Sequence, residues 1–105
     1  MTPDQLWFDP SRCFIGNEWL APADARTLSL TDPSTGLPIA EIARGSQADI
    51  DQAVAQAHAA LSGPWGHMSA PERGRILQRI GQRVLEKIEQ LARLESMDVG
   101  KPLSQ

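Results

Sequence analysis

The chain has 105 residues, with 10 lysines and arginines against 13 aspartates and glutamates, a formal net charge of −3 and a pI near 5.2. Its 41% hydrophobic and 22% charged residues are ordinary for a globular domain, which excludes collagen-like, disulfide-rich and wholly disordered chains. Net acidity argues against a protein that binds nucleic acid through a basic face. One cysteine cannot form an internal disulfide, so we expect a reducing compartment.

The sequence contains no run of 18 or more apolar residues, so we expect no transmembrane helix and no membrane partner. Residues 1–12 form an N-terminal extension that carries Asp4 and Asp9. This extension lacks the basic and apolar regions of a secretory signal and the arginine-rich character of a mitochondrial presequence. We therefore expect a cytoplasmic protein.

The first half of the chain predicts strands and turns over about residues 13–43. Residues 13–15 and 18–20 flank the pair Gly16-Asn17, and two turn residues between short apolar segments are typical of a β-hairpin. Because glycine stands first in the pair, we expect a type II′ turn, which requires a positive φ at that position.

A second hairpin is predicted immediately downstream. Hydrophobic and polar residues alternate over residues 27–31, and residues 32–36 (DPSTG) combine an Asx side chain, a proline and a glycine, which together favour a turn. Residues 39–43 then form the second strand. We expect the two strands to pair across this turn.

A first amphipathic helix is predicted over residues 47–61. Ser46 is placed to cap it by accepting a hydrogen bond from the N3 amide, and Asp49 puts negative charge in the first turn, where the helix dipole favours it. Gly63 and Pro64 end the helix. One apolar stripe recurs at helical spacing: Ile50, Val54, Ala57 and Leu61.

A second, longer helix is predicted over residues 70–97. Ser69 and Glu72 match a capping box, and Gly100 and Pro102 end the run. Its apolar stripe comprises Leu77, Ile80, Val84, Ile88 and Leu91. Arginines interleaved with glutamates cover the other face, which we interpret as solvated and not as a phosphate-binding face.

These elements lack a complete hydrophobic core. Each helix carries a single apolar stripe that needs a partner, and two-stranded hairpins are marginal on their own. We therefore expect residues 13–105 to be the incomplete N-terminal part of a larger domain. A competing hypothesis is a non-catalytic helical-hairpin interaction module that binds a partner through the exposed stripe of its second helix.

No group of residues forms an active site by spacing. Cys13 is the only candidate nucleophile and has only the charge of Arg12 beside it, so we interpret it as a small apolar strand residue. His58 and His67 lie nine residues apart across a helix break, which does not fit a metal site. No glycine-rich phosphate loop follows a predicted strand. Asp98, before Val99-Gly100-Lys101, is either a turn residue, which we favour, or a cation ligand.

Six segments, in order and at family-like spacing, resemble the opening of the aldehyde dehydrogenase superfamily. They are residues 14–19 (FIGNEW), 32–36 (DPSTG), 39–43 (IAEIA), 48–54 (ADIDQAV) together with 63–65 (GPW), 72–77 (ERGRIL) and 91–103 (LARLESMDVGKPL). The resemblance covers about residues 13–105. It departs in two places: the usual Asn-Gly turn is reversed as Gly16-Asn17, and Val99 replaces a commoner Asn or Thr.

The resemblance implies an enzyme that oxidises an aldehyde to a carboxylic acid with NAD or NADP, and that forms a homo-oligomer. In this family the catalytic cysteine, the catalytic glutamate and the glycine loop for the cofactor lie downstream of such a segment. Cys13 does not match the motif of the nucleophile, so no catalytic or cofactor-binding residue is carried over. The segment alone is expected to be inactive.

The resemblance also implies an α/β fold in which two β-hairpins and two amphipathic helices pack on a Rossmann-like domain that is missing here. Some members hold K⁺ or Na⁺ near the end of the second helix. Their ligands match the backbone carbonyl of Thr31 and the carboxylate of Asp98. Further ligands of such an ion would lie outside this chain.

Overall fold

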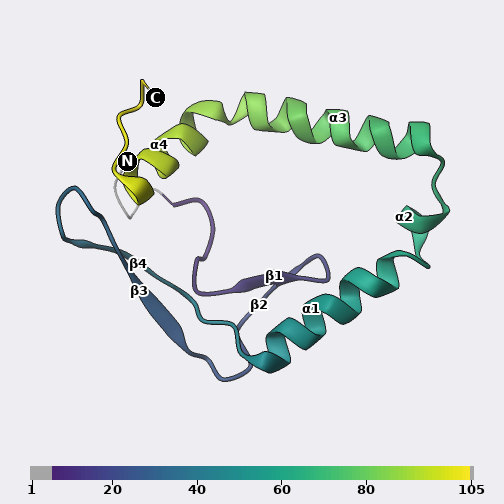
Figure 1. Cartoon of the computed structure of the whole chain (residues 1–105), viewed down its shortest axis with the longest axis horizontal. Helices are drawn as coiled ribbons and strands as arrows, with labels where there is room; N and C mark the ends of the chain where they lie inside the picture. Colours follow the sequence, from purple (N-terminus) through teal and green to yellow (C-terminus); the bar gives the residue numbers. More distant parts are fainter. Residues whose placement is uncertain (1–5, 105) are drawn as a thin grey trace.

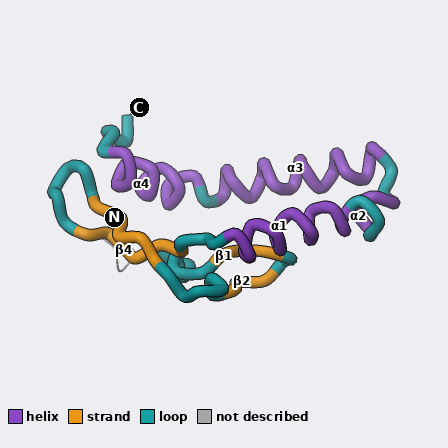
Figure 2. Tube along the Cα trace, turned by 60° about the horizontal axis from the view of Figure 1, so that its bottom comes forward, coloured by secondary structure: helices purple, strands orange, loops and turns teal. Residues whose placement is uncertain are grey.

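The structure is a computed structural model, and it describes residues 6–104. Four short strands precede four helices, and the strands form two separate two-stranded antiparallel sheets (Figures 1 and 2). The elements are β1 (Cys13–Ile15), β2 (Glu18–Leu20), β3 (Thr27–Thr31), β4 (Pro38–Ala43), α1 (Gln47–Ala60), α2 (Pro64–His67), α3 (Ala70–Glu86) and α4 (Ile88–Val99).

The first hairpin, β1–β2, has the predicted register, in which Ile15 pairs with Glu18. The predicted turn type is wrong. Gly16 and Asn17 have φ values of 61° and 67°. Two consecutive positive φ angles define a type I′ turn, whereas type II′ needs only the first. Asparagine tolerates the left-handed region, so Asn17 follows the glycine there.

The predicted pairing of the second hairpin, β3–β4, is confirmed and runs from Thr27 opposite Ala43 to Thr31 opposite Pro38. Strand β4 begins at Pro38, one residue before the predicted start. A bulge between Leu30 and Thr31 shifts the register next to the turn. The 32–36 turn closes through the N–H of Gly36, which donates to the carbonyl of Asp32 at 2.8 Å. Strand β4 contributes Ile39, one of the few buried apolar side chains.

The first helix begins at the predicted N-cap, Ser46, and its N3 residue Asp49 ties it to the strands. The carboxylate of Asp49 accepts from the backbone N–H of Ser46 at 2.8 Å and from that of Ala23 at 3.0 Å. Ala23 lies 26 residues away, in the connection between β2 and β3. Asp49 is only 6% exposed, and this one buried carboxylate joins α1 to the strand-rich region.

The prediction of one continuous helix over residues 70–97 is wrong, because the helix breaks at Lys87. Lys87 has φ −109° and ψ 13°, and its N–H is shared between the carbonyls of Arg83 and Val84. The bond to Val84 is an i→i−3 bond, so the turn tightens there and α4 leaves in a new direction. A one-turn helix, α2, also occupies residues that were expected to be loop.

The small core lies where α4 meets the β3–β4 hairpin. Ile39 is 6% and Met97 9% exposed, and the other buried apolar residue among residues 6–104 is Pro22, in the connection between β2 and β3. An aromatic group from the N-terminal segment covers the adjoining hairpin, where the rings of Phe8 and Trp19 stack with centroids 6.0 Å apart. Beyond the break at Lys87, side chains of α4 and of the second hairpin line one common cavity.

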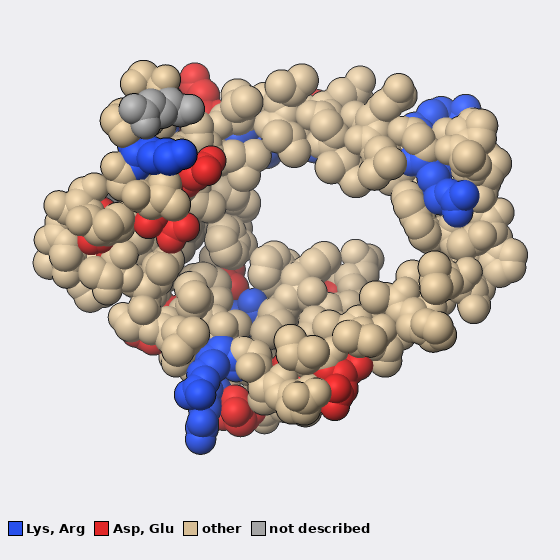
Figure 3. Space-filling model, in the orientation of Figure 1, with Lys and Arg blue, Asp and Glu red and all other residues tan. Residues whose placement is uncertain are grey.

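The rest of the molecule is an open ring, in which α1 runs beside the β1–β2 hairpin and α2 and α3 lead away from the strands (Figure 1). The space-filling view shows an opening through the molecule (Figure 3). The radius of gyration is 16.9 Å, whereas a compact domain of this length has about 13 Å. The accessible surface is 7979 Å², against about 5,800 Å² for a compact monomer of this mass. The described residues therefore enclose only a small core.

Both predicted apolar stripes are exposed. Ile50, Val54 and Leu61 of the first helical segment are 56%, 62% and 66% exposed. On α3, Leu77 and Ile80 are 60% and 54% exposed. Within residues 6–104, no helix has the length and apolar character that crossing a bilayer requires.

Candidate site at the end of α4

The C-terminus of α4 lies against the turn of the second hairpin. Gly100 ends the helix with φ 76°, and its N–H donates to the carbonyl of Ser96 at 2.9 Å. A Cβ atom at this position would lie 3.2 Å from Cγ of Pro33 and 3.4 Å from Oγ of Ser34. Only glycine combines this left-handed conformation with so close an approach. The sequence predicts the helix end at Gly100 but not the contact with the turn.

The turn itself is held by Asp32. Its carboxylate accepts from the backbone N–H of Ser34 at 2.8 Å, which is the predicted Asx geometry. Its backbone N–H donates to the carbonyl of Leu37 at 2.9 Å. The Asp32 side chain is therefore committed to the turn, and the groups that remain beside it are backbone carbonyls.

Thr31 is the residue on which the resemblance places a carbonyl ligand. Its partner across the hairpin is Pro38, which has no N–H to donate to that carbonyl. The bulge next to Thr31 also interrupts the regular ladder. The local sequence thus prevents the usual ladder hydrogen bond from the residue opposite Thr31, which leaves its carbonyl suited to another ligand.

Asp98 lies in the last turn of α4, where the helix dipole is negative. No basic residue stands in that last turn, and the carboxylates of Glu95 and Asp98 line the adjacent cavity. Negative side chains at a helix C-terminus are unfavourable unless a cation offsets them. The donor set at this junction, carboxylate and carbonyl oxygen, fits a hard cation in chemistry.

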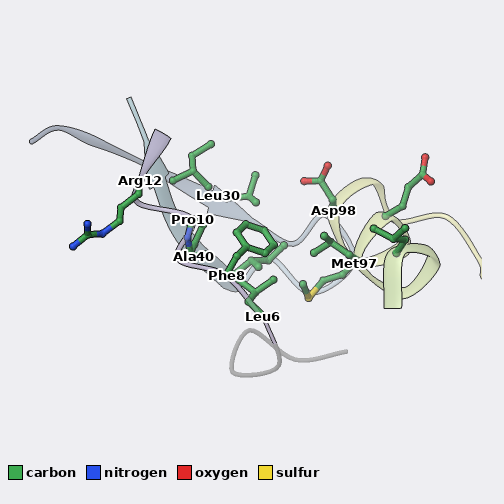
Figure 4. Close-up of a pocket in the computed structure, with 13 residues that line it drawn as sticks. Leu6, Phe8, Pro10, Arg12, Leu30, Ala40, Met97 and Asp98 are labelled. Carbon is green, nitrogen blue, oxygen red and sulfur yellow. The ribbon is translucent and has the colours of Figure 1, made fainter. Parts of the chain in front are cut away.

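A cavity of about 520 Å³ opens beside this junction, between the N-terminal segment, the second hairpin and α4. In Figure 4, Phe8 and Met97 face one another across its middle, whereas Arg12 and Asp98 lie at opposite ends. Leu30, which precedes Thr31, lines the same cavity as Asp98. The structure therefore brings the two predicted ligand positions to one region of the molecule.

The other candidate residues lie apart from this region. Cys13 is a half-buried free thiol in β1. Its neighbour Arg12 bonds the carboxylate of Asp9 at 3.3 Å, so the one cation next to Cys13 is already paired. His58 is exposed on α1, and Nδ1 of His67 lies 2.8 Å from the carbonyl of Gly63. Residues 6–104 contain no group of three His, Cys, Asp or Glu side chains that could hold a metal ion.

The described residues do not fit a dinucleotide. Such a cofactor needs a parallel strand that leads through a glycine loop to an open helix N-terminus, whereas both sheets here are antiparallel. The N-termini of α1 and α3 carry the carboxylates of Asp49 and Glu72, which accept from the backbone N–H groups of their N-caps. These carboxylates occupy the positions that a pyrophosphate would take.

Two carboxyl groups, of buried Asp49 and exposed Asp9, have lowered pKa values for different reasons. The backbone N–H of Ser46 lowers the pKa of the Asp49 carboxyl, with help from the Ser46 hydroxyl and the N–H of Ala23, while burial acts in the opposite direction. Asp9, in the exposed N-terminal segment, also has a lowered pKa, first because of the hydroxyl of Ser11.

Comparison with known proteins decides the family. The family model for the aldehyde dehydrogenase family matches residues 19–105. The chain belongs to the aldehyde dehydrogenase family. The fold of the chain is accordingly the α/β fold of the N-terminal part of these enzymes, as the resemblance implies.

Among family members of known sequence, the chain is 42% identical over 94 residues to a mitochondrial aldehyde dehydrogenase from Mesocricetus auratus. It is 43% identical over 90 residues to an aldehyde dehydrogenase from Paracoccus denitrificans, and 37% identical to a 2-hydroxymuconic semialdehyde dehydrogenase from a Pseudomonas species. These alignments cover 86–88% of this chain. The chain spans about a fifth of the length of the relatives (18–19%).

Solved structures of similar fold belong to the same family. A protein from Burkholderia cenocepacia that is assigned as an aldehyde dehydrogenase matches 88% of this chain at 53% identity and a TM-score of 0.85. Betaine aldehyde dehydrogenase from Staphylococcus aureus, solved with NAD⁺, matches 99% at 31% identity and a TM-score of 0.89. The chain covers 19% and 21% of these two proteins.

Proposed function

We propose that this chain forms the N-terminal part of an enzyme that oxidises an aldehyde to a carboxylic acid with NAD or NADP as hydride acceptor. The observation that carries the proposal is the 53% identity, over 88% of the chain, to the Burkholderia protein with the same fold. The NAD⁺ in the Staphylococcus enzyme supports the class of cofactor. A cytoplasmic homo-oligomer is part of this proposal.

The described residues contribute structure and not reaction chemistry. Oxidation by this route needs an activated nucleophile, a bound hydride acceptor and a base for water. Cys13 has no base or unpaired cation next to it, and the N-termini of the two longest helices, α1 and α3, carry carboxylates. We therefore propose that the hairpins and helices pack on a Rossmann-like domain, and that residues 1–105 alone are inactive.

We further propose that the junction of α4 and the second hairpin holds K⁺ or Na⁺, with the Thr31 carbonyl and the Asp98 carboxylate among its ligands. The absence of an N–H on Pro38 and the lack of a basic residue in the last turn of α4 support this assignment. The test compares Asp98→Asn with the control Asp24→Asn, which alters an exposed carboxylate in the loop before β3. Both variants are made in a chimaera in which residues 13–104 replace the matching segment of the Paracoccus denitrificans enzyme. K⁺ in place of choline should raise the thermal midpoint in the control and not in Asp98→Asn.

A chimaera tests the enzyme proposal. Residues 13–104 replace the matching segment of the Paracoccus denitrificans aldehyde dehydrogenase, to which they are 43% identical. We expect NAD⁺-dependent aldehyde oxidation within about tenfold of the parent enzyme. A folded chimaera without activity would contradict the proposal. The competing hypothesis of a separate helical-hairpin module predicts instead a folded chimaera without activity, because the segment would then not belong to the enzyme.

A further inference from the structure

The exposed side of α3 carries a groove with an apolar floor and a cationic rim. It has a volume of about 370 Å³ and is lined by Ile76, Ile80, Val84, Arg79 and Arg83 of α3 and by Lys87 at the break, together with Leu91 of α4 and Trp7 of the N-terminal segment. The three cations are spaced four residues apart, so they form one ridge along the helix beside the apolar side chains. We call these six α3-side residues the α3 groove.

The cationic rim has little compensation within the chain. No carboxylate lines the groove. Among the described residues, Glu86 reaches Arg83 at 3.0 Å, but the two side chains are 57% and 80% exposed. Exposed pairs of this kind contribute little to stability. Four arginines against two glutamates give α3 a positive charge in a chain whose net charge is negative.

This charge excludes an antiparallel second α3 as the occupant of the groove. In a two-fold antiparallel helix pair, the ridge of Arg79, Arg83 and Lys87 would face its own copy. Like charges that face one another across such a contact are destabilising. An occupant must present apolar side chains to Ile80 and Val84 and carboxylates to the ridge.

We infer that the α3 groove binds an acidic amphipathic helix, supplied by the dehydrogenase polypeptide beyond the residues described here. This inference rests on the proposed function. The occupant presents apolar residues at i, i+3 or i+4, which fill the floor, and Asp or Glu residues along the adjacent ridge. The charges select the helix and its register, and the apolar contact provides most of the binding energy.

The test uses the Paracoccus chimaera. The triple variant Arg79→Glu, Arg83→Glu, Lys87→Glu reverses the ridge, and Arg26→Glu, Arg44→Glu, Arg93→Glu reverses three other exposed cations as a control of equal charge change. We expect the ridge variant to melt at least 5 °C below the control at low salt. The gap should shrink in 0.5 M NaCl, because salt screens charge repulsion and not a loss of packing.

A milder variant keeps the test decisive where charge reversal prevents folding. Arg79→Gln, Arg83→Gln, Lys87→Gln should lower the midpoint by about half as much, with the same dependence on salt. Equal midpoints for the ridge and control variants would overturn the inference, as would a gap that salt does not change. So would a concentration-dependent dimer of residues 1–105 that Ile80→Asp dissociates, because a second copy would then occupy the groove.

The two proposals fail in different ways. An unmodified chimaera that folds without activity contradicts the proposed function before the ridge is changed. An active chimaera that tolerates the ridge variants supports the proposed function and contradicts only the acidic helix.

Discussion

The strand-rich half of the molecule buries apolar side chains, whereas the helical half leaves them exposed. Where α4 crosses the second hairpin, Ile39 and Met97 are nearly inaccessible. On α3, about two to three turns before the break at Lys87, Leu77 and Ile80 are more than half exposed. Both halves have regular secondary structure. Regular helices and strands can therefore form where local signals are strong, whereas a core requires that a second surface be present.

The largest expected effect is a difference in the free energy of unfolding that is lost when an isoleucine in each half is truncated to alanine. Ile39→Ala should lower the free energy of unfolding of the 105-residue chain by about 2–5 kcal/mol, because it removes a buried side chain. The matched variant Ile80→Ala should cost less than about 0.5 kcal/mol in the same chain, because its side chain is exposed. Urea denaturation measures both. Similar losses at the two positions would contradict the contrast.

A smaller effect is expected where α4 contacts the turn. Gly100→Ala should destabilise the chain by about 2 kcal/mol, since it combines a left-handed φ with a close approach to Pro33. Gly36→Ala is the control, because φ is 74° there but the space around its Cβ is empty. It should cost only the conformational strain of about 1 kcal/mol. Equal losses in denaturant titrations would mean that the contact with Pro33 contributes nothing.

The link between the halves through Asp49 should depend on pH. The pKa of its carboxyl is lower in the folded chain, so its contribution is complete above the ordinary value of 3.8. That contribution is lost as pH falls through the lowered value, because the unfolded chain binds the proton first.

Asp49→Asn should therefore lower the melting temperature by about 4–8 °C near pH 7. The difference from the native chain should narrow below about pH 4. Asp51→Asn, on the exposed side of the same helix, is the control and should change little. Melting curves between pH 2.5 and 7 provide the measurement, and a difference that widened at low pH would contradict the assignment.

The smallest expected effect is a gain in stability on α3. A Cβ at Gly81 would meet no atom within 4 Å, so Gly81→Ala should stabilise the 105-residue chain by about 0.4–1 kcal/mol. In the Paracoccus chimaera the same change should give a smaller gain or a loss, because an occupied α3 face leaves less room. An identical gain in both proteins would show that nothing approaches α3 at this point.

Local signals explain which parts of the fold the sequence predicts. The hairpin registers follow from Gly16-Asn17 and from residues 32–36, and both helix starts follow from their N-cap residues. The break at Lys87 has no such signal, since no proline or glycine lies between residues 82 and 99. The apolar stripe continues at helical spacing through this point, so the sequence predicts one helix where the structure has two.

The candidate site shows the same division. The sequence alone offers Asp98 as a turn residue or a cation ligand, whereas its pairing with Thr31, 67 positions away, rests only on resemblance to the family. What brings them into one region is the contact of Gly100 with Pro33, a long-range feature without a local signal. The turn type at Asn17 was missed for a different reason, because glycine at the first position is compatible with both primed turns.

The exposed α3 also has a consequence while the proposed enzyme is being synthesised. A polypeptide about five times as long as this segment, made at about 5–20 residues per second, leaves α3 uncovered on the ribosome for roughly 20–80 s after it emerges. During that interval its apolar side chains are open to aggregation. Arg79, Arg83 and Lys87 then act as gatekeepers, because charges beside an apolar segment keep nascent chains apart until the covering surface has been made.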